Sequence, residues 1–348
     1  MGGLLIIGAI IFSTLIAGNF TNKFIIFLFI ITILFTTIGF YDDYLKLTKH
    51  KNGLSGKKKI LGQFIITGLT FAFICKYGVI NKTLDFSIVN PLIKGSFLYI
   101  TPVLFFVFML FVIIGSSNAV NLTDGLDGLV SGPIIIVSVT LLIITYLTGH
   151  YEYAKYLNLY YVRESAEITV YLASVIGALI GFLWYNFYPA QVFMGDTGSM
   201  IAGFLIAVLA IKFFALNTEA LESAIIHPTN KIWVLLAIIF IPFFDTTRVF
   251  TTRLLRHGQP FKADRSHIHH VMIDYMKLSH SQASVLLAFI NLIVCVVILY
   301  LNTFLSSLYL GIVLGVIFIG LAGLLFYVNR SYHTRKKKQK IRHIVNEI

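Results

Sequence analysis

Carboxylate, amide and imidazole side chains gather in four short segments of this 348-residue sequence, and the first segment pairs two acids. Asp42 and Asp43 are adjacent, and Lys46 lies one helical turn beyond Asp43. Neighbouring carboxylates repel each other and raise one pKa unless a cation neutralises them. Lys46 supplies part of that charge, and a divalent ion or a phosphorylated ligand would supply or use the rest. Ordinary solvation at the start of a loop is the alternative interpretation.

The second segment offers the densest set of oxygen ligands. Asn118, Asn121, Asp124 and Asp127 recur every three residues, so on a helix they would form one slowly drifting polar row. A glycine follows each aspartate directly, which permits close backbone approach or a broken helix end. Amide and carboxylate oxygens are hard ligands that suit Mg²⁺ together with water and phosphate oxygens. A structural helix cap would need one such residue, not four.

The third segment places Asp196 between Gly195 and Thr197, with Ser199 following. This pattern suits a helix N-terminus, where backbone N–H groups could meet a phosphate while the carboxylate holds a metal ion. A plain N-cap by Asp196 or Ser199 is the alternative.

The fourth segment contains His267, His269 and His270 shortly after Arg265. Three histidines in four residues could bind zinc, but no cysteine lies nearby and the other segments offer oxygen ligands. Contacts to phosphate groups beside Arg265 fit better. Elsewhere Asp245 precedes Arg248 by one helical turn, which predicts a simple ion pair.

The elements that carry these segments are apolar runs of about 17 to 23 residues, long enough to cross a bilayer. We expect ten spans, at residues 4–20, 24–40, 60–78, 97–117, 130–148, 168–186, 199–216, 232–250, 283–301 and 307–328. The predicted fold is therefore all-α, a polytopic helical membrane bundle. Residues 1–328 would form a single transmembrane catalytic domain, and residues 329–348 a basic cytoplasmic tail.

The composition supports a membrane protein. Hydrophobic residues make up 57% of the sequence and charged residues 12%, with a mean hydropathy of +0.86. Soluble domains carry about 25% charged residues, so this chain is neither a cytosolic enzyme nor a disordered protein. Cys75 and Cys295 both lie in apolar runs, which excludes a disulfide framework and a cysteine metal cluster.

Alternating spans place all four polar segments and the tail on one side of the membrane. That side carries 19 of the 27 lysines and arginines, so the positive-inside rule makes it cytoplasmic. Together the segments predict a Mg²⁺-dependent site for phosphorylated substrates, one of them reached from the bilayer. The tail, including residues 335–338, would anchor the topology and touch anionic lipid headgroups. No other feature supports nucleic-acid binding.

The four segments resemble the polyprenyl-phosphate N-acetylhexosamine-1-phosphate transferases, the family that contains the MraY and WecA/TagO branches. The matching strings are Asp-Asp-x-x-Lys at 42–46, Asn-Ala-Val-Asn-Leu-x-Asp-Gly-Leu-Asp-Gly at 118–128, Gly-Asp-x-Gly-Ser at 195–199 and His-x-His-His at 267–270. MraY-type enzymes resemble each other in three consecutive histidines, which Ile268 interrupts here, so this segment looks like the WecA/TagO branch. Residues 54–63 lean toward MraY, and both branches stay open.

The resemblance implies that a polyprenyl (undecaprenyl) phosphate attacks the β-phosphorus of a UDP-N-acetylamino sugar and releases UMP. In the WecA/TagO branch the sugar would be GlcNAc. The reaction would be the first membrane step in the synthesis of a cell-envelope glycan, such as lipopolysaccharide or a cell-wall polysaccharide. Transfer of phospho-N-acetylmuramoyl-pentapeptide, as in MraY, is the alternative. An ion-coupled transporter is a distant alternative that predicts acids near the bilayer midplane and inverted repeats.

The resemblance also assigns roles to residues. It implies Mg²⁺, or Mn²⁺, at Asp196 with Asn121 as a second ligand. Asp42 or Asp43 would orient or deprotonate the lipid phosphate beside Lys46. The remaining residues would bind the UDP-sugar: Asn118, then Asp124 and Asp127 facing the nucleotide, Phe193 stacked on uracil, and Arg265, His267, His269 and His270 on the diphosphate.

The resemblance further implies an inner (plasma) membrane protein whose motif loops are cytoplasmic, with a homodimer left open. Family members usually begin with another transmembrane helix and a loop ending in Pro-x-x-Gly-Gly, whereas this chain starts at Met1-Gly2-Gly3. Its ten spans would then be ten of the eleven in the WecA branch.

Overall fold

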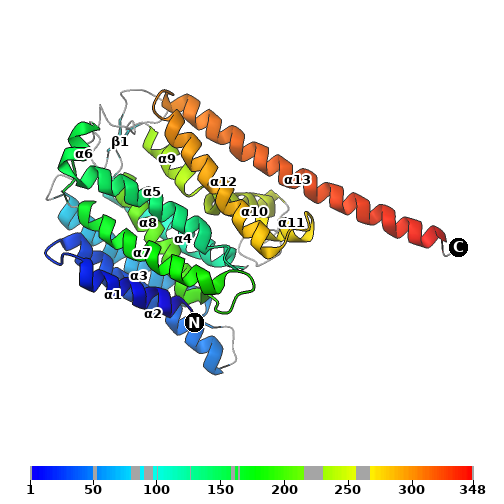
Figure 1. Ribbon diagram of the computed structural model, residues 1–348, viewed down its shortest axis with the longest axis horizontal. Coiled ribbons are helices and arrows are strands. Elements are labelled where there is room, and N and C mark those ends of the chain that lie inside the picture. Colours follow the sequence, from blue (N-terminus) through cyan, green and yellow to red (C-terminus); the bar gives the residue numbers. More distant parts are fainter. Residues whose placement is uncertain are drawn as a thin grey trace.

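A computed structural model describes residues 2–49, 53–79, 87–89, 97–99, 101–125, 127–157, 161–163, 165–214, 230–255 and 267–346 (Figure 1). The described part is helical apart from one small hairpin, which confirms the all-α prediction. The α-helices are α1 (Gly2–Ala17), α2 (Lys23–Lys49), α3 (Gly56–Ile74), α4 (Pro102–Thr123), α5 (Ser131–Gly149), α6 (Tyr151–Tyr156), α7 (Ser165–Asn186), α8 (Gly195–Phe214), α9 (Lys231–Ile238), α10 (Phe240–Leu255), α11 (Ile268–Asp274), α12 (His280–Leu301) and α13 (Ser307–Asn346). A π-helical turn, Cys75–Val79, continues α3, and β1 (Ser87–Val89) pairs antiparallel with β2 (Phe97–Tyr99). Cys75 and Cys295 are free thiols.

Seven described helices are long and apolar enough to cross a membrane: α2, α3 with its π-helical turn, α4, α5, α7, α12 and α13. The pair α9 and α10 adds an eighth if it counts as one span, while α1 and α8 contain only shorter apolar stretches. The predicted count of ten is therefore not confirmed, although every predicted run overlaps a helix.

The predicted span at 232–250 is broken, because α9 and α10 meet at an angle of 85°. Pro242 explains the break. In a continuous helix its ring would clash with the carbonyl of Ile238, four residues earlier, and it has no N–H to donate. In the structure α9 ends at Ile238, and Pro242 lies in the first turn of the new helix, where a missing N–H costs little.

Large apolar side chains cover the outside of the bundle. Only 17% to 39% of the most apolar stretch of each of the seven helices is buried, and Phe111 and Trp184 are 77% and 83% exposed. Contiguous apolar surface of this extent needs a non-aqueous partner. The chain is therefore a multi-pass membrane protein.

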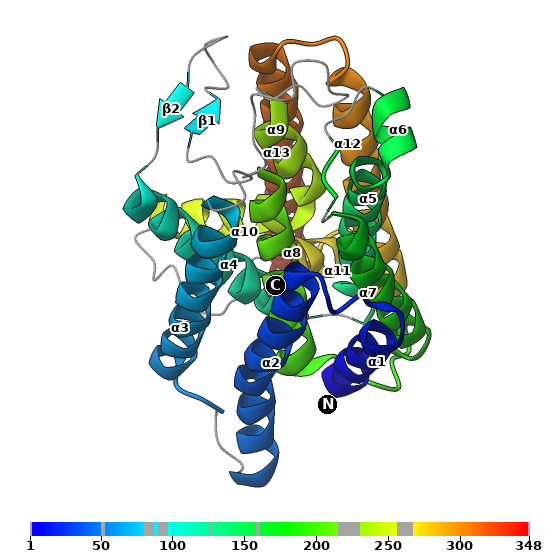
Figure 2. The ribbon, with the colours of Figure 1, turned by 90° about the vertical axis from the view of Figure 1, so that its left-hand side faces the viewer.

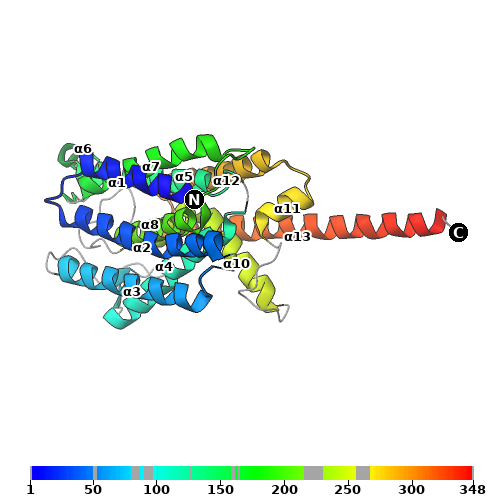
Figure 3. The ribbon, with the colours of Figure 1, turned by 90° about the horizontal axis from the view of Figure 1, so that it is seen from below.

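Helix α8 lies at the centre, packed against α2 on one flank and α4 on another (Figure 3). Glycines allow the close approach. A Cβ atom at Gly39 of α2 would lie 2.6 Å from the Cα of Thr197, and one at Gly203 would lie 2.6 Å from the carbonyl oxygen of Ser116 in α4. The first turn of α8 is therefore pressed directly against α2.

The two ends of the bundle differ. The β-hairpin and α6 lie at one end, whereas the N-terminus, the last turns of α2, and α11 lie at the other (Figures 1 and 2). Helix α13 runs the length of the bundle and continues past it, so the predicted tail boundary at residue 328 falls inside one continuous helix.

Candidate active site

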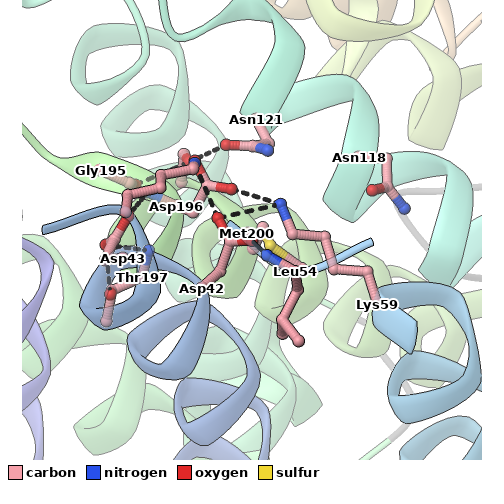
Figure 4. Close-up of polar contacts among 12 residues, drawn as sticks. Asp42, Asp43, Leu54, Lys59, Asn118, Asn121, Gly195, Asp196, Thr197 and Met200 are labelled. Carbon is pink, nitrogen blue, oxygen red and sulfur yellow. Dashed lines mark hydrogen bonds and ion pairs between the residues drawn. The ribbon is translucent and has the colours of Figure 1, made fainter. Parts of the chain in front are cut away.

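Four charged side chains from three helices meet where α2 crosses the first turn of α8 (Figure 4). Lys46 Nζ lies 2.7 Å from Asp42 Oδ2 and 2.9 Å from Asp196 Oδ1. Lys59, from the first turn of α3, contacts Asp196 Oδ2 and lies 3.3 Å from Asp42 Oδ2. Both lysines therefore bridge the same two carboxylates. A third carboxylate, Asp43, lies beside these two. We call Asp42, Asp43, Asp196, Lys46 and Lys59 the ion cluster.

Lys46 does not neutralise Asp43, as the spacing had suggested; it pairs with Asp42, four residues before it. Asp43 instead caps α8. Its Oδ1 accepts a hydrogen bond from the Asp196 N–H (3.2 Å), and its Oδ2 accepts from the Thr197 N–H (3.0 Å) and hydroxyl (2.6 Å). The N–H groups at a helix start have no partner within the helix, so a carboxylate from α2 satisfies them.

Two glycines with positive φ shape the backbone around the cluster. Gly53 has φ +68°, and the next residue, Leu54, donates its N–H to Asp42 Oδ1 at 2.7 Å. Gly195 has φ +69° at the start of α8, and a Cβ atom there would lie 2.8 Å from Asp43 Oδ2. Any other residue would be strained at these positions, so both aspartates are held by backbone that only glycine fits easily.

We expect Asp43→Ala to lower the apparent melting temperature in detergent, because loss of a helix cap costs about 1–2 kcal/mol. Asp43→Asn, which keeps one acceptor oxygen, should melt between the wild type and Asp43→Ala. Lys58→Ala, at an exposed neighbouring position, is the control. A variant Asp43→Ala that melts at or above the wild-type temperature would contradict the capping role.

The three carboxylates fit a divalent cation. One oxygen of each of Asp42, Asp43 and Asp196 lies within 4.8 Å of the others. Three carboxylates and two ammonium groups leave a negative surplus in a partly buried place, and carboxylate oxygens are the ligands that Mg²⁺ prefers. The three residues could therefore hold Mg²⁺ if a lysine gives way to it.

The polar row expected over residues 118–127 does not form, because α4 ends at Thr123 and Asp124 is its C-cap. Asn118 faces α3, where its Nδ2 donates to Gln63 Oε1 at 2.9 Å. Asn121 faces α8, where its Oδ1 accepts from the Ser199 hydroxyl at 2.7 Å. The segment thus separates into two helix–helix contacts and a loop, and Figure 4 shows Asn121, but not Asn118, beside the ion cluster.

Asp127 and Phe193 belong to neighbouring loops. Asp127 Oδ2 accepts from the Ala190 N–H at 3.0 Å, which ties the loop after α7 to the loop after α4. Phe193 is 65% exposed in that loop, and its carbonyl accepts from the Gly2 N–H at 2.9 Å. The exposed ring leaves an aromatic face available to a ligand.

Asp124 lies close enough to the ion cluster for the charges of the cluster to change its pKa. Burial, together with the negative charges of Asp196 and Asp43, raises the pKa of Asp124 to about 7. Without a bound cation, this carboxyl therefore changes protonation near neutral pH.

This raised pKa predicts a pH-dependent stability. Between pH 4 and 7 the folded protein holds a proton at Asp124 that the unfolded chain has released, so the free energy of unfolding falls as pH rises through this window. In EDTA, Asp124→Asn should therefore raise the melting temperature at pH 8 and change it little at pH 4. An equal shift at both pH values would show that Asp124 does not titrate in this range.

Asp245 organises the histidine segment. Its Oδ2 lies 2.8 Å from His267 Nδ1, and its Oδ1 accepts from the Ile268 N–H at 2.8 Å. The predicted ion pair with Arg248 is confirmed at 2.9 Å. Fully buried, Asp245 thus fixes the start of α11 to α10.

The histidine segment contacts the loop that follows Asp124. The His267 and His269 rings are nearly parallel at 5.8 Å, and His270 lies 4.1 Å from His269. A Cβ atom at Gly125 would lie 2.8 Å from His269 Nε2, so this ring rests on the loop that follows Asp124. Arg265 lies outside the described residues.

Comparison with known protein families finds a match over the part of the chain that contains the ion cluster. Residues 25–214 match Glycosyl transferase family 4, which is more than half of the sequence. This chain belongs to that family. The match contains the whole ion cluster and ends before the histidine segment.

Three relatives carry the name phospho-N-acetylmuramoyl-pentapeptide-transferase. Those from Fusobacterium nucleatum subsp. nucleatum and Endomicrobium trichonymphae are 46% and 42% identical over 212 residues. The one from Vesicomyosocius okutanii is 42% identical over 213 residues. Each alignment covers 61% of this chain and 58% of the relative. The chain thus aligns with less than two thirds of the length of each of these relatives.

These names support the MraY alternative better than the WecA/TagO branch, which is not confirmed. The interrupted histidines favoured WecA/TagO, but they form a short segment outside the family match. Residues 54–63, which favoured MraY, include Lys59 of the ion cluster and Leu54, which donates its N–H to Asp42. For the family branch, the segment inside the site is the better guide.

Lys59 and the Asp245–His267 pair were missed as parts of the site. Lys59 closes a run of three lysines that looked like topology charges. A signal existed, because Lys59 shares a helical face with the buried polar residues Gln63, Thr67 and Thr70. No comparable local pattern links Asp245 to a histidine 22 residues away.

Proposed function

We propose that this protein transfers phospho-N-acetylmuramoyl-pentapeptide from its UDP derivative to a polyprenyl phosphate. The ion cluster carries this proposal, since it gathers three carboxylates and two ammonium groups on one membrane-embedded bundle. A site that moves a phosphoryl group between two anionic substrates needs fixed charges of both signs. The MraY-named relatives support this donor over UDP-GlcNAc.

In the proposed reaction an oxygen of the lipid phosphate forms a bond to the β-phosphorus of the UDP-sugar. The bond from that phosphorus to the bridging oxygen breaks, and UMP leaves with that oxygen. Lys46 and Lys59 would hold phosphate oxygens near the carboxylates. Asp42, held by Leu54, would keep both lysines in place, and this positioning accounts for much of the catalysis in such transfers.

A divalent cation, Mg²⁺ or Mn²⁺, is part of the proposal. Asp196 would hold it, with Asp42 or Asp43 and Asn121 close by. When bound, such an ion neutralises charge that develops on the transferring phosphoryl group. Burial is the main cause of the raised pKa of Asp124, and the negative charges of Asp196 and Asp43 add to it, so the cluster places negative charge where a cation would lie.

The nucleotide would lie between the Asp124 loop and Phe193, and the histidine segment would face the diphosphate. His269 lies against the Asp124 loop at Gly125, so these groups could converge on one ligand. We place this end of the bundle in the cytoplasm, at the inner membrane. Among the described residues, Asp42, Asp43 and Asp196 gather around the first turn of α8 and do not follow a path through the bundle, so the transporter alternative gains no support.

A donor comparison tests the proposal. Purified protein in detergent would be supplied with polyprenyl phosphate, Mg²⁺ and labelled UDP-MurNAc-pentapeptide, UDP-GlcNAc or UDP-GalNAc in separate reactions. We expect label in the lipid phase with UDP-MurNAc-pentapeptide alone. Transfer from UDP-GlcNAc alone would return the chain to the WecA/TagO branch.

A further inference from the structure

The last helix, α13, lies outside the part of the chain that the family match covers, yet it packs against the element that carries the histidines. It contacts α9, α11 and α12. Figure 1 shows α13 running beside α12. Its buried leucines Leu310, Leu314 and Leu325 belong to the same core as Val271 and Met272 of α11. The helix is therefore part of the folded bundle.

The beginning of α13 is fixed to α9. The Trp233 indole N–H donates to the Ser307 hydroxyl at 2.8 Å. The same ring lies over Gly311, where a Cβ atom would be only 2.7 Å from it. Nearby, Asn230 donates to Asn302 Oδ1 at 2.9 Å in the connection that leads into α13. These contacts fix the position of α13 along its axis and its rotation about that axis relative to α9.

Three turns further along, Phe318 reaches α10. Its ring packs edge-on against Phe244, with 4.8 Å between ring centroids, and also lies 6.2 Å from Phe243. Phe244 is fully buried and immediately precedes Asp245. Asp245 in turn holds His267 and the Ile268 N–H. A continuous line of contacts thus runs from α13 through α10 to the start of α11.

We propose that α13 positions the histidine segment, with Phe318 as a positioning residue that acts through Phe244 and Asp245. Phe318 touches no substrate. It holds the Phe244 side of α10 so that Asp245 can accept hydrogen bonds from α11, and α11 then holds His269 against Gly125. The kinetic consequence of this inference rests on the proposed function, but the structural consequence does not.

Amide hydrogen exchange tests the structural consequence without any substrate. Phe318→Ala should speed exchange in the peptide that contains 267–274 on the order of tenfold, the factor that corresponds to the loss of an aromatic pair. Peptides from α2 and α8 should be unchanged. Phe326→Ala is the matched control, because Phe326 lies on the same helix but is 63% exposed. Asp245→Asn keeps one acceptor oxygen, so it should reproduce part of the effect of Phe318→Ala by weakening the link between α10 and α11.

Faster exchange confined to α11 supports the inference, and exchange in α11 equal to that of Phe326→Ala overturns it. If Phe318→Ala loosens the whole bundle, Phe318→Leu gives a milder change. That variant should raise α11 exchange severalfold, and equal acceleration in α2 and α8 would overturn the inference.

The kinetic measurement separates this inference from the proposed function. If the wild type transfers sugar phosphate, Phe318→Ala should raise the KM for the UDP-sugar about tenfold and leave the KM for polyprenyl phosphate unchanged. If the wild type transfers nothing, the proposed function fails while the exchange result still decides the inference.

Discussion

Replacing Asp196 by asparagine is expected to reduce the rate of sugar-phosphate transfer by a factor of about 10² to 10³, the usual cost of removing one transition-state charge contact. Asp196 meets Lys46 through one oxygen and Lys59 through the other, so the change unsettles both lysines at once. The backbone of residue 196 still donates to Asp43, so α8 keeps its cap and the fold should be retained.

The measurement is kcat with saturating donor and lipid, together with Mg²⁺ dependence. Asp196→Asn should also need more Mg²⁺ for half-maximal rate. Glu152→Gln, in the first turn of α6 at the opposite end of the bundle, is the control for loss of an acid. If Asp196→Asn keeps more than half of the wild-type turnover, Asp196 is not at the reaction centre.

Lys59→Ala should have the second large effect, a loss of about 10²-fold in kcat. The Lys59 side chain is 15% exposed and bridges Asp42 and Asp196, whereas its neighbours Lys57 and Lys58 are exposed. A half-buried ammonium group aimed at two carboxylates can transfer its contact to a phosphate with little rearrangement.

Lys58→Ala is the matched control, because it removes the same charge from the same helical turn. It should leave kcat within a factor of about two, since an isolated surface charge contributes little. Lys59→Ala should bind Mg²⁺ at least as tightly as the wild type, because it removes a cation that competes for Asp42 and Asp196, and this distinguishes it from Asp196→Asn. Equal losses in Lys58→Ala and Lys59→Ala would mean that the lysine run acts only through its overall charge.

The apolar runs predicted most of the helices, and the spacing of their polar ends predicted which segments meet. Asp42, Asp43 and Asp196 were expected on one membrane face and lie within one cluster. This succeeded because topology alone places alternate loops together. It does not fix which acid does what, and only the crossing of α2 over α8 shows that Asp43 caps a helix while Asp42 and Asp196 share two lysines.

The other differences have local or long-range causes. The break between α9 and α10 was readable from Pro242, and the end of α4 from the two glycines after the aspartates. The link between Asp245 and His267 was not readable, because it depends on how α10 and α11 pack. Phe318 and Phe244 are 74 residues apart in the sequence, so the contact between their rings follows only from the fold.

The most direct test of the account is the stoichiometry of products from purified protein, polyprenyl phosphate, UDP-MurNAc-pentapeptide and Mg²⁺. We predict one UMP for each lipid-linked sugar diphosphate formed, with both products abolished by EDTA and restored by added Mg²⁺ or Mn²⁺. Formation of UDP with a lipid-linked sugar monophosphate, or no nucleotide product from any of the three donors, would contradict it.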